Sequence, residues 1–189
     1  SHEEDRYWVH EEAKEVHQSP PQEVLFDHTE KLPSEAQEVI RFINERLPAF
    51  LGEYGLMKAV DITPDHFESA DVTHEDYRAS TSDGHYDEDY QKIGLEKVSW
   101  SIDPMAFSVA SVHEMIHMQS FQSVTIKKHD TFPSESVLRI RRSGMTIVTE
   151  DAVYFHYLNE AITEELTKRF MKQYADSLPY VDVPFEDWL

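Results

Sequence analysis

The segment His113-Glu114-Met115-Ile116-His117 has the pattern H-E-x-x-H, and it constrains the fold of this chain more than any other feature. On a helix, His113 and His117 project from one face, one turn apart. Two imidazoles in this arrangement can bind one zinc ion at roughly 2.0–2.1 Å each. Glu114 lies about 100° around the helix, where it can reach a metal-bound water without being a ligand. The pattern therefore predicts a zinc-binding helix with Glu114 as general base.

The residues around the motif favour a half-buried helix. Val109, Val112 and Ile116 recur at helical spacing. Upstream, Asp103 and Pro104 supply an N-cap residue and a proline at the first helical position. The alternative interpretation is a helix with two exposed histidines and a solvated glutamate.

Composition limits the classes of protein to which the chain can belong. With 189 residues, of which 40% are hydrophobic, the chain is long enough for one domain with a core. The absence of cysteine excludes disulfides, cysteine metal sites and thiol catalysis. We find no signal peptide and no apolar run long enough to cross a membrane, and we expect a soluble protein of unknown location. The chain begins with Ser1, which indicates a piece of a longer protein.

A formal net charge of −20 bears on the partners of the chain. Such a charge repels phosphate groups, so we expect no binding to nucleic acid or to an anionic membrane. Because the acidic residues are spread along the chain, we favour a solubilising surface over a preference for cationic substrates. The sequence leaves the oligomeric state open.

The sequence predicts an acidic N-terminal arm over residues 1–33, with a short helix around residues 3–17, and one domain over residues 34–189. A helix is expected from Ser34, where Gln37 stands at the capping-box position, and Pro48 follows it. Its predicted buried side consists of Val39, Ile40, Phe42, Ile43 and Leu47.

The middle of the chain predicts short elements before the H-E-x-x-H helix. We expect a strand within residues 65–72, a short helix over 73–79 and turns over 80–89. Alternation at Ile93 and Leu95 predicts a further strand at about Gln91–Leu95. We expect this strand, or the one nearest it, to be a sheet edge that borders the active-site cleft. An extended peptide could join that edge as an additional strand.

The C-terminal part predicts a β-ribbon over residues 137–155, with a bend at Ser143-Gly144, followed by a helix over about 156–175. The predicted core residues of that helix are Ala161, Ile162, Leu166 and Phe170. The tail from Pro179 is expected to dock on the body of the protein through Tyr180, Val181, Phe185 and Trp188.

A catalytic zinc ion usually has three protein ligands and a water, so a third His, Glu or Asp is needed. The chain carries Asn159-Glu160-Ala161-Ile162-Thr163-Glu164 on its last predicted helix. With the H-E-x-x-H segment, this hexapeptide resembles the gluzincin metallopeptidases, the thermolysin-like clan. In that family a second helix supplies a glutamate from the motif N-E-x-x-[ST]-[DE]. The resemblance covers about residues 84–175.

The resemblance implies that Glu160 is the third ligand. It also implies that Glu164 orients a ligand histidine, for which His113 is the first candidate. Residues 160 and 164 are one turn apart on one helix face, and ligand histidines normally donate their other N–H to a carboxylate or a carbonyl. Other candidates for the third ligand stay open: His129, His156, Glu150 and Asp151, of which His156 is the strongest. Without the upstream motif, Glu160, Glu164 and Glu165 would be interpreted as a solvated helix face.

The fold that the resemblance implies is α+β and zincin-like, with a small sheet packed on the active-site helix and on the glutamate-bearing helix. The function that it implies is a zinc metallopeptidase acting on a peptide or protein substrate. Tyr157 is slightly favoured for stabilising the oxyanion over Tyr154, Tyr174 and Tyr180, and core packing is the other role open to each.

Two other functions are compatible with the sequence. One is a non-catalytic zinc-binding or interaction module, and the other is a different amide or ester hydrolase on the same scaffold. Glu114 argues against the module, because a structural zinc site is closed by four ligands and needs no glutamate that stays off the metal.

Overall fold

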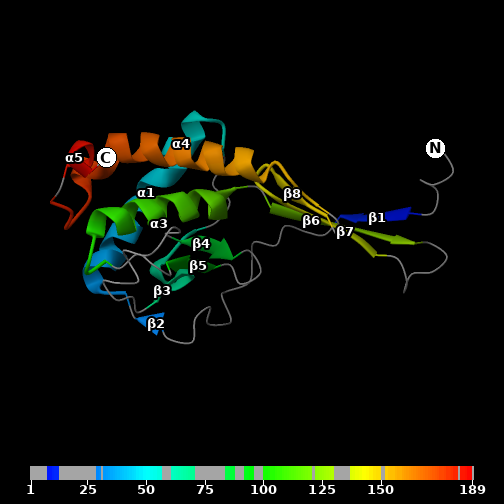
Figure 1. Cartoon of the computed structure of the whole chain (residues 1–189), viewed down its shortest axis with the longest axis horizontal. Helices are drawn as coiled ribbons and strands as arrows, with labels where there is room; N and C mark the ends of the chain where they lie inside the picture. The colour runs from blue at the N-terminus through cyan, green and yellow to red at the C-terminus, as the bar shows by residue number, and fades with distance from the viewer. Residues whose placement is uncertain are drawn as a thin grey trace. The chain divides into compact units, whose positions relative to one another are not determined.

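The computed structural model has an α+β fold of helices and two small sheets, as the sequence predicts (Figure 1). It describes residues 8–12, 29–30, 32–56, 61–70, 84–87, 92–95, 100–120, 122–129, 137–149, 152–182 and 184–188. None of the described helices is both long and apolar enough to cross a membrane.

The chain divides into two compact units. The first comprises residues 1–18 and 120–162, and the second comprises residues 19–119 and 163–189. Helix α4 (His156–Tyr174) begins in the first unit and continues without interruption into the second. The predicted arm over residues 1–33 is not tested by this division and stays a prediction.

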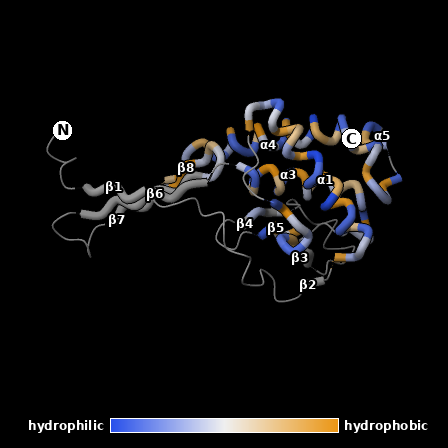
Figure 2. The backbone as a smooth tube through the Cα atoms, turned by 180° about the vertical axis from the view of Figure 1, so that it is seen from behind, coloured by the Kyte–Doolittle hydropathy of each residue, from blue (hydrophilic) through white to orange (hydrophobic). Residues whose placement is uncertain are grey.

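Helix α1 (Ser34–Glu53) forms because apolar residues recur along it every three or four positions, so that hydrophobic and hydrophilic stretches alternate in Figure 2. Its buried residues are Ala36, Val39, Ile40, Ile43, Leu47, Phe50 and Leu51. Pro33, rather than Ser34, is the N-cap residue, and the side chain of Gln37 donates to the carbonyl of Leu32 over 2.8 Å.

Pro48 lies inside α1, and the prediction that it follows the helix is wrong. A proline in a helix interior costs about 3 kcal/mol or more. Beyond it, Phe50 and Leu51 are each 1% exposed. Burying two such side chains contributes roughly 1.5–3 kcal/mol each, which offsets the cost of the proline.

The sheet of the second unit has the strand order β2-β3-β5-β4. Its strands are β2 (Thr29–Glu30), β3 (Phe67–Ala70), β4 (His85–Asp87) and β5 (Lys92–Leu95). The pair β3–β5 is parallel and the other two pairs are antiparallel. The strand predicted within residues 65–72 is confirmed at β3, which the 3₁₀ turn η2 (Pro64–His66) precedes.

The predicted strand at Gln91–Leu95 is confirmed as β5, but the expectation that it is a sheet edge is wrong. It lies between β3 and β4, and all four of its residues are buried. Among the described strands, the short strand β4 pairs with β5 alone and takes the edge position beside it. Periodicity predicted the strand, but the order of strands depends on long-range pairing that a single sequence does not display.

A buried ion pair joins β3 to β5. Lys92 Nζ contacts Glu68 Oε1, and the two residues are 9% and 7% exposed. We expect Lys92→Met to lower the free energy of unfolding by about 3–5 kcal/mol, because it deprives a buried carboxylate of this ammonium. Chemical denaturation measures this loss. Adding Glu68→Leu should restore most of the stability, and a double variant no more stable than Lys92→Met would contradict this explanation.

Helix α3 (Pro104–Gln119) carries the H-E-x-x-H motif and packs on the sheet and on α1 (Figure 1). Its start is as predicted, because Asp103 Oδ1 accepts the N–H of Ala106 over 2.9 Å. Most of its residues are buried, including Met105, Val112 and Ile116, so the helix is more deeply buried than predicted.

The sheet of the first unit is antiparallel, with the strand order β1-β6-β7-β8-β9. Its strands are β1 (Trp8–Glu12), β6 (Gln122–His129), β7 (Val137–Ser143), β8 (Thr146–Val148) and β9 (Val153–Tyr154). The predicted β-ribbon is confirmed by β7, β8 and β9. The helix predicted around residues 3–17 is wrong over β1, where main-chain pairing with β6 overrides local preference.

Helix α4 agrees with the predicted last helix, but its buried face differs. Leu166 and Phe170 are buried as predicted, whereas Ala161 and Ile162 are exposed. The buried face instead includes three polar residues: Asn159, Thr163 and Thr167. The buried face predicted from apolar periodicity is wrong here, because this method assigns only apolar residues to a buried face.

The C-terminal tail docks as predicted at Phe185, which is 4% exposed, and at Val181, which packs against the core. Tyr180 instead is 54% exposed and donates its hydroxyl to Glu38 over 2.9 Å. The side chain of Trp188 and the helix predicted over residues 73–79 lie outside the described residues. His66 is half-buried in η2, and burial lowers its pKa.

Candidate metal centre

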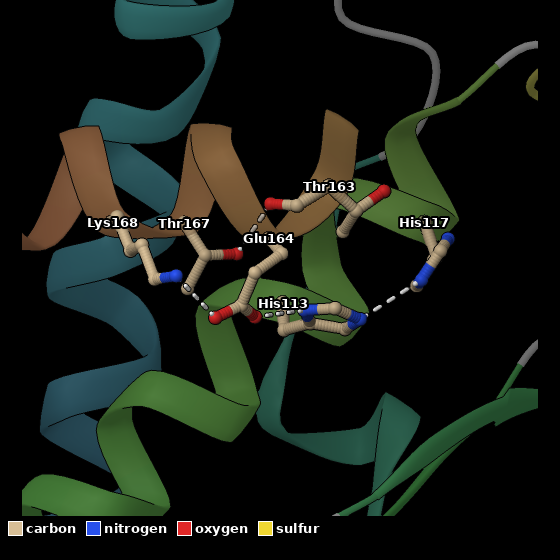
Figure 3. Close-up of polar contacts among 6 residues, drawn as sticks. All are labelled: His113, His117, Thr163, Glu164, Thr167 and Lys168. Atoms are coloured by element: carbon tan, nitrogen blue, oxygen red, sulfur yellow. Dashed lines mark hydrogen bonds and ion pairs between the residues drawn. The ribbon is translucent and has the colours of Figure 1, made fainter. Parts of the chain in front are cut away.

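Helix α3 places the two histidines of the motif against each other. His113 Nε2 and His117 Nε2 are 3.1 Å apart, and the ring centroids are 4.8 Å apart (Figure 3). Two nitrogens that bind one tetrahedral zinc ion at 2.0–2.1 Å lie about 3.3 Å from each other. The two Nε2 atoms are therefore spaced as a shared metal ion requires.

Glu164 lies behind His113, on the side away from His117 (Figure 3). Its Oε2 is 3.6 Å from His113 Nδ1, and its Oε1 is 3.1 Å from Lys168 Nζ. A carboxylate at Nδ1 favours the tautomer of His113 that leaves Nε2 as a metal-binding lone pair. Glu164 thus stands where its predicted role requires it, and the role itself stays a prediction.

Glu160 is one helical turn before Glu164 on the same uninterrupted helix. Ligand atoms of His113, His117 and Glu160 all lie within 4.8 Å of one another. Among the described residues these three form the group that could hold a metal ion. Two imidazole nitrogens and one carboxylate oxygen are donors that zinc accepts in catalytic sites.

The other candidates for the third ligand are not part of this group. His156, the strongest of them, places its Nδ1 3.7 Å from Glu160 Oε1, so it contacts the candidate ligand. Glu150 and Asp151 and the side chain of His129 lie outside the described residues.

Glu114 is 6% exposed, and His117 is 9% exposed. The alternative of a solvated glutamate between two exposed histidines is therefore wrong. Glu165 does belong to a solvated helix face, where it forms an exposed ion pair with Arg169 over 2.7 Å.

At Gly84, a residue that the sequence did not indicate as part of the site, the backbone lies close to the side chain of Glu114. A Cβ atom at this position would lie 3.3 Å from Glu114 Cγ, 3.0 Å from Leu95 Cδ2 and 3.1 Å from the carbonyl oxygen of Gly94. The residue precedes the edge strand β4, so the start of that edge lies against the predicted general base.

Lys168 is a further residue near the site that the sequence did not indicate, although its position four residues after Glu164 is a signal for an ion pair.

Tyr157, the residue favoured for oxyanion stabilisation, is 87% exposed. Core packing, the alternative for this side chain, is therefore wrong. Its ring centroid lies 5.6 Å from that of His156. The catalytic role of Tyr157 stays a prediction.

Comparisons with known proteins do not place the chain in a family. No family model, curated protein or solved structure matches it. The assignment of function therefore depends on the geometry of the site.

Replacing Glu164 by glutamine tests its part in the site. We expect Glu164→Gln to weaken zinc binding by about 10–100-fold, because the neutral amide lacks the negative charge that lies 3.6 Å from His113 Nδ1. Competition with a chromophoric chelator measures this affinity. Glu165→Gln is the matched control, since Glu165 has the same i,i+4 pairing on the same helix and its ion pair is with Arg169. Equal affinities in the two variants would make Glu164 a surface residue only.

Proposed function

We propose that this chain is a zinc metallopeptidase of the gluzincin type. The observation that carries the proposal is a buried glutamate, Glu114, on the helix that supplies His113 and His117, together with Glu160 as a third donor. Three protein donors leave a coordination position for water, which is the arrangement of catalytic zinc sites.

The protein's own residues would carry the proton transfers. Zinc, when bound, lowers the pKa of its water to about 7 and polarises the scissile carbonyl. Glu114 takes a proton from the attacking water and delivers it to the leaving amine. Burial of Glu114 keeps bulk water from competing for this proton, and Glu164 holds His113 in orientation from behind.

Two features support a peptide as the substrate. Gly84, which directly precedes the edge strand β4, lies beside Glu114, and an extended peptide could add to such an edge through main-chain hydrogen bonds. The second feature is an open pocket of about 530 Å³, lined by Val153, Phe155, His156, Tyr157 and Leu158.

The pocket has the chemistry of a site for an apolar side chain. Val153, Phe155 and Tyr157 are 58%, 58% and 87% exposed, and an exposed cluster of this kind commonly marks a binding surface. Phe155 has φ 58°, a strained conformation for a bulky residue that is typical of functional positions. His156 lines the pocket and also contacts Glu160, which links the pocket to a candidate metal ligand.

Hydrolysis of a mixed peptide library, followed by mass spectrometry, tests the proposed function. The zinc-loaded protein should cleave peptides, lose this activity to a strong chelator and regain it when zinc is added. Cleavage that persists in metal-free protein would contradict the proposal. So would a complete absence of cleavage by zinc-loaded protein across a library that samples all residue pairs.

A further inference from the structure

Asn159, the first residue of the N-E-x-x-T-E motif, has a role that the metal centre does not explain. It is 8% exposed, and its Oδ1 accepts the backbone N–H of Met145 over 3.0 Å. Met145 lies in the turn between β7 and β8. The side chain of Asn159 therefore ties the first turns of α4 to the β-ribbon.

Gly144 lets this turn approach Asn159 closely. Ser143 pairs with Thr146, so Gly144 and Met145 form a two-residue hairpin turn, in which Gly144 has φ +57°. A positive φ at the first turn position favours glycine. A Cβ atom here would lie 2.4 Å from Asn159 Oδ1 and 3.3 Å from Ser120 Cβ. Any side chain at this position would displace Asn159.

Two of the residues in this contact, Ser120 and Asn159, lie next to or within the ligand-bearing helices. Ser120 directly follows Gln119, the last residue of α3, and Asn159 directly precedes Glu160. The turn at Gly144 thus touches the chain at the end of one helix and near the start of the other. A metal site demands that its ligands be held within about 0.5 Å of the productive geometry.

We propose that Asn159 and Gly144 are positioning residues that hold Glu160 where it completes the metal-binding group. The inference rests on the proposed function, since it requires that His113, His117 and Glu160 share a metal ion. The β7–β8 turn thereby supports the third ligand.

The test measures zinc affinity and the visible spectrum of the cobalt-substituted protein in Asn159→Ala and Gly144→Ala. We expect a loss of zinc affinity of about 10–100-fold, the size seen when the support of a ligand is removed. The cobalt bands should shift, because the coordination geometry changes. Asn159→Asp keeps the oxygen that accepts from Met145, and it should bind zinc and cobalt nearly as the unmodified protein does.

The chain offers a matched control for each variant. Asn44 Oδ1 accepts the backbone N–H of Ile62 over 3.3 Å, which is the same type of contact in the second unit. Gly55 has φ +76° and no atom within 4 Å of a Cβ built on it, so Gly55→Ala adds backbone strain without a clash. Asn44→Ala and Gly55→Ala should reduce resistance to denaturant while leaving zinc affinity and the cobalt spectrum unchanged.

The outcomes separate this inference from the proposed function. If the unmodified protein binds zinc and both Asn159→Ala and Gly144→Ala bind it equally well with an unchanged cobalt spectrum, the positioning role is wrong and the proposed function stands. If the unmodified protein binds no zinc, both are wrong. Should Gly144→Ala fail to fold, Asn159→Ala alone decides, since it removes the acceptor of the Met145 N–H and introduces no clash.

Discussion

Glu114→Gln is expected to reduce peptide hydrolysis by about 10²–10⁴-fold while zinc stays bound. The amide has nearly the shape of the carboxylate, so the buried position of Glu114 can accept it. His113, His117 and Glu160 are untouched, and the metal-binding group should persist. The amide cannot take up the proton of the attacking water at neutral pH. Cleavage rates of zinc-loaded protein, normalised to measured zinc content, give the size of the effect.

A surface variant provides the baseline for this measurement. Glu165→Gln makes the same chemical change on an exposed helix face and should leave the cleavage rate unaltered. If Glu114→Gln, fully loaded with zinc, cleaves as fast as the unmodified protein, the proposed mechanism is wrong whatever metal is bound.

Glu160→Ala is expected to weaken zinc binding by more than about 100-fold. Structural zinc sites with four ligands bind with apparent free energies of about 10–16 kcal/mol, or roughly 3 kcal/mol for each ligand. A loss of that size corresponds to about two orders of magnitude in affinity. Titration of metal-free protein against a chelator of known affinity measures the change.

His156→Ala is the matched control for Glu160→Ala. His156 lies on the same helix and contacts Glu160 at 3.7 Å, but it is not part of the candidate group of metal ligands. Its variant should keep zinc affinity within a few-fold of the unmodified protein. Unchanged affinity in Glu160→Ala together with a large loss in His156→Ala would make His156 the third ligand.

Local sequence signals predicted the elements that form the site. The spacing of His113 and His117 and the cap at Asp103 define α3, and the spacing of Glu160 and Glu164 defines the facing part of α4. Each of these signals lies within about two helical turns, where side-chain periodicity is a direct consequence of helix geometry. The third donor was found because a resemblance, rather than a physical rule, linked two distant segments.

Features that depend on pairing between distant segments could not be predicted. The internal position of β5, the strand β1 in place of a helix and the approach of Gly84 to Glu114 all arise from such contacts. The strand β6 was also missed, although Val124 and Ile126 alternate with polar residues in the way that predicts a strand. Asn159 was missed because a polar residue in a helix is normally assigned to its exposed face.

X-ray absorption at the zinc edge of the purified, unmodified protein, combined with metal analysis, shows how many zinc ions it holds and which side chains bind them. We expect one zinc ion per chain, bound by two imidazoles, one carboxylate and one water. A chain that retains no zinc would contradict the proposed metal site. A zinc ion with four protein ligands would contradict it as well, because the position for the attacking water would be closed.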